Sequence, residues 1–101
     1  MNLIDYAGNN IRLTDERLYH IKEHPEMSAH EARIKETILS PDIVVKSRSD
    51  EEARVYYRHY PGLTIGDKHL CVVIKFKTED AFVITAYFTD SVKKGDVIWK
   101  K

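Results

Sequence analysis

The stretch that decides the fold is the most strand-like run in the chain, Phe82-Val83-Ile84-Thr85-Ala86-Tyr87-Phe88-Thr89-Asp90. In a strand, successive side chains point to opposite faces of the sheet. One face of this strand would then carry Phe82, Ile84, Ala86 and Phe88, and the other would carry Val83, Thr85, Tyr87 and Thr89. We therefore expect the first face to pack on a core and the second, with its three hydroxyl groups, to stay open to a partner.

The length and composition of the chain predict a single globular domain over residues 1–101. The chain has 101 residues, of which 43% are hydrophobic and 32% are charged. A chain of this size can bury one efficient core, and this composition is ordinary for a folded protein. The formal net charge is zero, so any surface that attracts nucleic acid must be a local one.

Neither a membrane segment nor a disulfide is expected. The apolar run around Leu70 to Ile74 is far shorter than the roughly 20 residues that a membrane helix needs, and the first residues lack the pattern of a secretory signal. The one cysteine, Cys71, has no partner within the chain and is expected to be a small apolar residue of a strand. We therefore expect a soluble, cytoplasmic protein.

Two helices are predicted in the first forty residues, after a short hairpin formed by 2–6 and 11–13. Thr14 has the side chain of an N-cap, and Pro25 should end the first helix near His24. Ser28 and Glu31 have the spacing of a capping box, which predicts a second helix that stops at Ser40-Pro41.

After Asp42 the apolar period changes from helical to two, which is typical of strands. The predicted strands cover 43–48, 54–60, 69–77 and 82–90. Two N-terminal helices followed by about four antiparallel strands predict an α+β fold, in which the helices pack on one face of the sheet and leave the other face open.

The alternation within the strands predicts which side chains share a face. The helix-covered face would take Leu70, Val72, Ile74 and Phe76, and, from the earlier hairpin, Ile43, Val45, Val55 and Tyr57. The open face would take Cys71 and Val73 together with a polar set made of Lys46, Arg48, Arg54, Tyr56, Arg58, Tyr60, Lys75, Lys77, Thr85 and Tyr87. This set has no carboxylate, so it suits phosphates and unpaired bases. A solvated sheet face rich in Lys and Tyr is the alternative.

Two histidines of the first helix are candidates for acid–base chemistry. His20 and His24 lie one helical turn apart with Arg17 on the same flank, away from the apolar stripe of Leu18 and Ile21. Cleavage of RNA without a metal requires a base for the 2′-hydroxyl, an acid for the leaving oxygen and a cation for the phosphorane. An exposed or capping role is the alternative for each histidine, and His30, His59 and His69 are interpreted as surface residues.

The run His20-Ile21-Lys22-Glu23-His24 also has the His-x-x-Glu-His pattern of inverted zinc peptidases. Pro25 would end the helix at the second of these ligands, and such enzymes need a third ligand on a larger scaffold. We therefore expect no metal and no cofactor.

Several short motifs resemble the small phage and bacterial toxin nucleases of the barnase, EndoU, colicin and RelE-like (BECR-fold) superfamily. The resemblance covers most of the chain from about Leu13, and its motifs are Leu13-Thr14-Asp15-Glu16-Arg17, His20-Ile21, His24-Pro25-Glu26, Ser40-Pro41-Asp42-Ile43-Val44-Val45, Tyr56-Tyr57-Arg58, Val72-Val73-Ile74-Lys75, Val83-Ile84-Thr85-Ala86-Tyr87 and Lys94-Gly95-Asp96-Val97-Ile98-Trp99. The resemblance implies a BECR/RelE-like fold with the active site on the open face of the sheet.

The function that the resemblance implies is a metal-independent endoribonuclease of toxin type, which leaves 2′,3′-cyclic phosphate ends. Its catalytic residues would be His20, Arg58, Lys75, Thr85 and Tyr87, with His24, Arg48 and Tyr56 as further catalytic or substrate-binding candidates. Its partners would be RNA and a cognate antitoxin or immunity protein, and the open sheet could also pair with itself in a homodimer. The alternative is a non-catalytic module that binds RNA or a protein.

Overall fold

The computed structural model describes residues 1–101 and contains two α-helices, one 3-10 helix and seven strands. In chain order the elements are β1 (Asn2–Ile4), β2 (Asn10–Arg12), α1 (Asp15–Lys22), η1 (Pro25–Met27), α2 (Glu31–Leu39), β3 (Ile43–Lys46), β4 (Ala53–Leu63), β5 (Gly66–Lys77), β6 (Asp80–Thr89) and β7 (Val97–Lys100). Neither α-helix has the length and apolar character needed to cross a membrane.

The start of α1 is as predicted, whereas the start of α2 is not. The Thr14 hydroxyl accepts a hydrogen bond from the Arg17 amide at 3.1 Å, which caps α1. The predicted capping box at Ser28 is wrong, because Pro25 begins η1 and the Ser28 hydroxyl donates to the Pro25 carbonyl instead. Helix α2 begins at Glu31, with His30 at its N-cap, and ends before Ser40-Pro41 as predicted.

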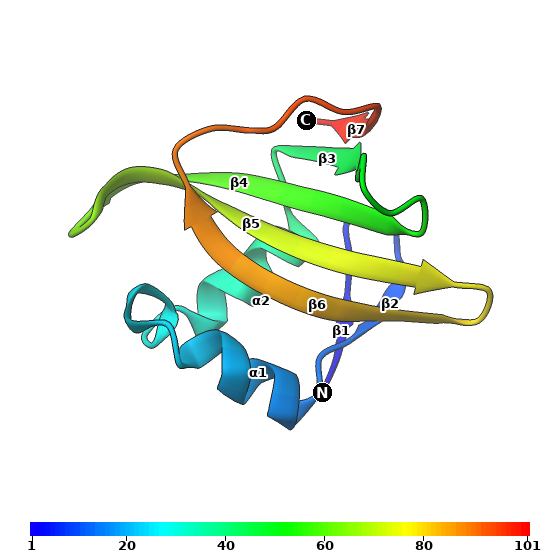
Figure 1. Cartoon of the computed structure of the whole chain (residues 1–101), viewed down its shortest axis with the longest axis horizontal. Helices are drawn as coiled ribbons and strands as arrows, with labels where there is room; N and C mark the ends of the chain where they lie inside the picture. Colours follow the sequence, from blue (N-terminus) through cyan, green and yellow to red (C-terminus); the bar gives the residue numbers. More distant parts are fainter.

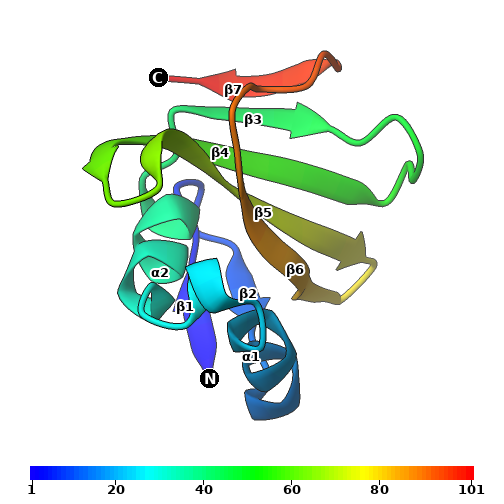
Figure 2. The same cartoon turned by 60° about the vertical axis from the view of Figure 1, so that its left-hand side comes forward.

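All seven strands form one sheet in the order β1-β2-β6-β5-β4-β3-β7. Every neighbouring pair is antiparallel except β2 and β6, which are parallel. Strands β4, β5 and β6 form the long curved centre, and both helices lie against one face of it (Figure 1). Figure 2 shows α2 between the central strands and β1, so the sheet curls around this helix as a half-barrel.

The predicted architecture, two helices on an antiparallel sheet of about four strands with a BECR/RelE-like layout, is therefore wrong. The structure has seven strands in a mixed, curled sheet. The three strands that were not part of the predicted sheet, β1, β2 and β7, have only three or four residues. Segments this short carry almost no alternation, so the sequence pattern could not separate β7 from a turn or connect the N-terminal hairpin to the sheet.

Two apolar clusters pack on the two faces of the sheet. The larger cluster lies between helices and sheet and includes Ile34 and Ile38 of α2 with Leu70, Val72 and Ile74 of β5. The smaller cluster lies on the opposite face, which we call the open face, and consists of Val45, Tyr57 and Cys71 with partly buried neighbours. Cys71 is a free, fully buried thiol in this second cluster.

The predicted faces of β3 and β4 are inverted in the structure. Val44 and Tyr56 pack in the helix-side core, whereas Val45 and Tyr57 belong to the open-face cluster. Both faces of this hairpin are covered by apolar side chains, so alternation alone could not tell them apart. The predicted core residues Ile43 and Val55 pack on the open face for the same reason; Arg54, Tyr56, Arg58 and Tyr60 lie on the helix side.

A β-bulge halfway along β6 reverses the alternation of its side chains, so that the two halves of the strand present opposite positions to the helices. Val73 pairs with Thr85 and Ile74 pairs with Val83, so Ile84 is the extra residue. Val83 therefore enters the helix-side core in place of the predicted Phe82 and Ile84, while Ala86 and Phe88 pack there as predicted. Beyond the bulge, Thr85 and Tyr87 share the open face with Val73 and Cys71, as expected.

Candidate functional site

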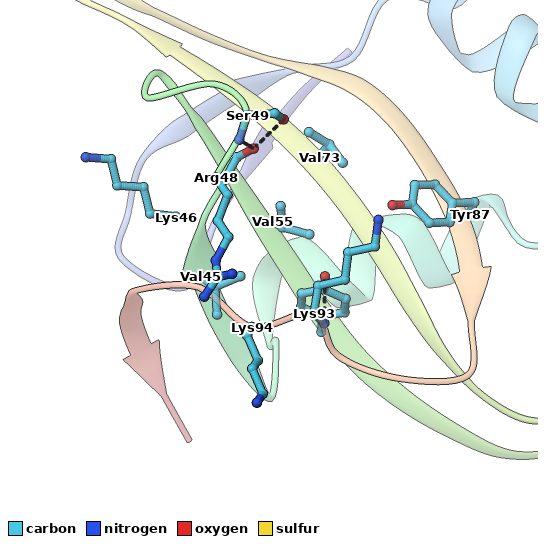
Figure 3. Close-up of a pocket in the computed structure, with 11 residues that line it drawn as sticks. Val45, Lys46, Arg48, Ser49, Val55, Val73, Tyr87, Lys93 and Lys94 are labelled. Atoms are coloured by element: carbon cyan, nitrogen blue, oxygen red, sulfur yellow. Dashed lines mark hydrogen bonds between the residues drawn. The ribbon is translucent and has the colours of Figure 1, made fainter.

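The main hollow of the open face, which we call the open-face pocket, has a volume of about 350 Å³. Its floor is formed by Val45, Val55 and Val73, which are cross-strand neighbours on β3, β4 and β5. Tyr57 of β4 and Tyr87 of β6 also line the pocket and add two hydroxyl groups. Figure 3 shows Tyr87 at the side of the pocket. The pocket is thus apolar at its base and polar at its mouth.

The segment after β6 closes one side of the open-face pocket. It crosses from β6 over the neighbouring strands to β7 (Figure 1), and the Lys93 amide donates to the Tyr57 hydroxyl at 3.3 Å. Val92 packs on the open-face cluster, and the Lys46 amide donates to the Asp96 carbonyl at 2.8 Å. These contacts fix Lys93 at the mouth.

The pocket is lined by four basic residues, Lys46, Arg48, Lys93 and Lys94, and by no carboxylate. None of these four side chains takes part in a salt bridge. In Figure 3, Lys93 extends into the mouth toward Tyr87, whereas Lys46 and Lys94 extend away from it. The nearest carboxylates, Glu51 and Asp96, border a separate hollow beside Lys46 and Arg48. The pocket is therefore suited to an anion.

Three weakly acidic groups lie together beneath this mouth, and all of them are held in their neutral form. Burial raises the pKa of the Cys71 thiol and of the Tyr57 hydroxyl. The pKa of Tyr87 is raised well above its ordinary value by two effects, of which the hydrogen bond with Cys71 is the larger and burial of the hydroxyl is the smaller. At neutral pH these groups therefore serve as hydrogen-bonding groups and add no negative charge to the pocket.

A second hollow, which we call the α1–β6 cavity, has a volume of about 380 Å³. Helix α1 and the residues after it contribute Arg17, Ile21 and Glu23 together with both candidate histidines, His20 and His24, and β6 contributes Ile84 and Thr85. The structure thus brings His20, His24 and Thr85 together, three of the residues that the sequence singled out.

The His20 imidazole lies between two carboxylates, one in α1 (Glu16) and one on the residue that follows α1 (Glu23). Its Nε2 lies 3.9 Å from Glu16 Oε1, and its Nδ1 lies 3.7 Å from Glu23 Oε1. The His20 side chain is 55% exposed, so these contacts are weak and solvent-screened. They leave the ring free to meet a substrate.

Both hollows border β6. Thr85 lines the α1–β6 cavity and pairs in register with Val73 of the pocket floor, and Tyr87 lines the open-face pocket two residues further on.

Three of the predicted site residues lie elsewhere. The Arg58 guanidinium is on the helix side, where it donates to the Ser40 carbonyl at 2.6 Å and lies 3.4 Å from Glu36. The Lys75 ammonium pairs with Asp50 at 3.0 Å, and this hydrogen bond raises its pKa. Tyr56 is fully buried in the helix-side core, where its hydroxyl donates to Asp5 at 2.6 Å. These three side chains do not reach either hollow.

The sequence analysis interpreted two histidines as surface residues and missed that they form a pair on the open face. His59 and His69 are directly opposite each other on β4 and β5, with ring centroids 4.9 Å apart. They lie one step beyond Tyr57 and Cys71 on the same face. The signal that could have found them is the β4–β5 register, which the sequence does not provide.

No group of three or more His, Cys, Asp or Glu side chains is arranged to hold a metal ion. The helical geometry required by the His-x-x-Glu-His pattern is absent, because α1 ends at Lys22 and His24 is the N-cap of η1.

Comparison with protein-family models, with curated proteins and with solved structures finds no match for this chain.

Proposed function

We propose that this protein is a metal-independent endoribonuclease of toxin type, which cuts RNA by transesterification. The observation that supports the proposal is that two imidazoles, one guanidinium and one hydroxyl line the single α1–β6 cavity, as His20, His24, Arg17 and Thr85. These are the group types that RNA cleavage requires: a base, an acid and a cation.

In this mechanism one of the two imidazoles removes the proton from the ribose 2′-hydroxyl. The 2′-oxygen attacks the adjacent phosphorus, and the bond from phosphorus to the 5′-oxygen breaks. The other imidazole gives a proton to the departing 5′-oxygen, so the products are a 2′,3′-cyclic phosphate and a free 5′-hydroxyl. Arg17 takes the place that the sequence had given to Arg58 and Lys75, and stabilises the charge on the phosphorane. Thr85 positions the phosphate.

The first test is incubation of the purified protein with mixed RNA in EDTA, followed by analysis of the fragment ends. We expect 2′,3′-cyclic phosphate termini from the unaltered protein. The variant His20→Ala should cut at least about 100-fold more slowly, because it loses one of the two proton-transfer groups.

The matched control is His30→Ala, since His30 packs on Phe88 with ring centroids 5.0 Å apart and lies outside the cavity. This variant should retain cleavage. Cyclic-phosphate ends that form at the same rate with His20→Ala would refute the proposal, as would their complete absence from the unaltered protein.

A non-catalytic module that binds RNA is the second candidate function. It is favoured by the open-face pocket, whose lining carries basic residues and no carboxylate. Such a module would bind RNA with an affinity that falls as salt increases, and it would produce no cleavage at any pH.

The toxin assignment has a cellular test. Induced expression in a bacterium should stop growth, and His20→Ala should relieve the arrest. A cell that makes such an enzyme needs an antitoxin or immunity protein, so co-purification from the native host should yield one that restores growth. Equal growth with and without induction would remove the toxin assignment and leave the cleavage chemistry to be judged in vitro.

A further inference from the structure

We propose that the open-face pocket binds one nucleotide, with its base on the valine floor and its phosphate at Lys93. The inference rests on the proposed function in one respect, because it takes this nucleotide to be part of the RNA that reaches the α1–β6 cavity.

The floor of the pocket has the shape of a base-stacking platform. Val45, Val55 and Val73 are paired in register across three adjacent strands, so their side chains form one continuous row. Adjacent strands lie about 4.8 Å apart, so the row extends over about 10 Å, which matches a planar base. An apolar surface of this kind can cover the flat face of any base, because burial of apolar area reads no particular edge.

Polar atoms border this platform. The Tyr57 and Tyr87 hydroxyls stand at one end, and Ser47 and Ser49 stand on the loop after β3. The two serine hydroxyls lie 3.2 Å apart and the Ser49 amide donates to Ser47 Oγ at 3.3 Å, so this loop holds its hydroxyls in place. Hydroxyl groups both donate and accept, which suits the edge of a base and the ribose.

The charge of the pocket selects an anionic ligand. Lys93 and Arg48 line it without any salt bridge, and Lys93 points into the mouth (Figure 3). Two other lysines of the sheet are paired with carboxylates, Lys75 with Asp50 and Lys68 with Asp90. A free cation beside an apolar platform fits a ligand that joins a flat apolar group to a phosphate.

The position of Thr85 connects this nucleotide to the proposed chemistry. Thr85 continues the row of valines onto β6, since it pairs with Val73, and it also lines the α1–β6 cavity. A nucleotide on the valine floor would therefore lie beside the strand that also borders the cavity of His20 and His24, and the RNA chain would continue from it toward that cavity.

The test is titration of the protein with the four ribonucleoside 5′-monophosphates, followed by NMR of the valine methyl groups and by calorimetry. We expect shifts of the Val45, Val55 and Val73 methyls. Ribose 5-phosphate, the matching nucleosides and inorganic phosphate should each bind at least tenfold more weakly, because each lacks the base or the phosphate.

The variants Lys93→Ala and Arg48→Ala should weaken nucleotide binding by at least tenfold. The control is Lys35→Ala, which removes the same charge from α2, where Lys35 pairs with Glu31, and which should bind nucleotides as the unaltered protein does. Unshifted valine methyls, equal binding of ribose 5-phosphate, or unaltered binding by Lys93→Ala would each overturn the inference. Binding of an acidic peptide but of no nucleotide would also overturn it.

Failure of this inference can be separated from failure of the proposed function. His20→Ala should leave the binding of nucleoside monophosphates unchanged, because His20 is not part of the pocket. Nucleotide binding without RNA cleavage would refute the nuclease proposal alone. RNA cleavage at an unaltered rate by Lys93→Ala, with no methyl shifts, would refute the nucleotide subsite alone.

Discussion

At the scale of single residues, the Asp5 carboxylate organises the turn between β1 and β2. It is only 1% exposed and accepts hydrogen bonds from the Ala7 amide at 2.9 Å, the Asn9 amide at 2.8 Å and the Asn9 side chain at 3.1 Å. The Tyr56 hydroxyl of β4 donates a fourth bond at 2.6 Å. A buried carboxylate is tolerated only when its oxygens are paired in this way. Tyr56 is therefore a structural residue.

The variant Tyr56→Phe should lower the free energy of unfolding by about 1.5–3 kcal/mol, because it removes a hydrogen bond to a buried carboxylate. Urea denaturation measures the change. The control is Tyr19→Phe, since Tyr19 is 68% exposed on α1 and its hydroxyl lies in solvent. Equal stability of the two variants would contradict the role given to the Asp5–Tyr56 bond, and RNA cleavage by the folded fraction of Tyr56→Phe should be unchanged.

At the scale of elements, the loop between β6 and β7 shapes the open-face pocket through one close backbone approach. A Cβ atom at Gly95 would lie 2.8 Å from the Lys46 carbonyl oxygen. Real Cβ atoms do not approach backbone oxygens this closely, so only glycine lets the loop lie against β3. The same loop carries Lys93 and Val92 to the mouth of the pocket.

The variant Gly95→Ala should displace the loop, weaken nucleotide binding and lower the free energy of unfolding by about 1–3 kcal/mol, as overpacking typically does. Calorimetry and thermal unfolding measure the two effects. Lys94→Ala, one residue earlier in the same loop, should change neither the stability nor the fold. A Gly95→Ala protein that binds nucleotides normally would show that the loop position does not matter for the pocket.

Elements with a clear local signal could be predicted from the sequence. Thr14 and Pro25 are local signals, which is why the start of α1 was correct and its end, after Lys22, came close to the predicted one. The faces of β3 and β4 depend on which neighbour covers them, and Val44-Val45 and Tyr56-Tyr57 offer an apolar residue to both sides. The bulge at Ile84 is a property of the pairing with β5, and one sequence contains no record of pairing.

The same difference, between local signals and features that depend on strand pairing, explains which residues of the candidate site could be predicted. Arg17 and His20 are close because they lie about one helical turn apart on α1, and helical spacing can be counted in the sequence; His24 follows only two residues after the helix ends. Arg58 and Lys75 were assigned from strand alternation, and neither reached a hollow. Arg58 faces the helices because the β4 faces are inverted, and Lys75 is on the predicted face but is held by Asp50 of the β3–β4 loop.

At the scale of the whole molecule, the curled sheet is held together by a few contacts between its ends. Strand β2 meets β6 at one register pair, which is supported by the ion pair of Arg12 with Asp80 at 2.7 Å. Tyr6 packs on Trp99 of β7 with ring centroids 4.8 Å apart. The turn after β1 thus contacts β7, the strand at the other end of the sheet.

The hydrogen bond from Arg12 lowers the pKa of Asp80 below its ordinary value of 3.8. A lowered pKa contributes stability that is present above the ordinary value and is lost as the pH falls through the folded value. Asp80→Asn should therefore lower the Tm at neutral pH, and this difference should shrink as the pH falls below 3.8, as measured by calorimetry. Glu79→Gln removes an unpaired carboxylate from the same turn and serves as the control. A Tm difference that persists at low pH would contradict this role.

The order of the strands has a consequence for how the chain is made. The central strands β3 to β6 follow one another in the chain and contact their neighbours locally, whereas β1 and β2 join the sheet through β6 and β7 joins it through β3. Local pairings form first, because they close the shortest loops. On the ribosome, the hairpin of β1 and β2 must therefore wait for β6, and the contact between Tyr6 and Trp99, the one tryptophan of the chain, forms only after β7 has been made. The fluorescence of Trp99 would report this final closure of the newly made sheet.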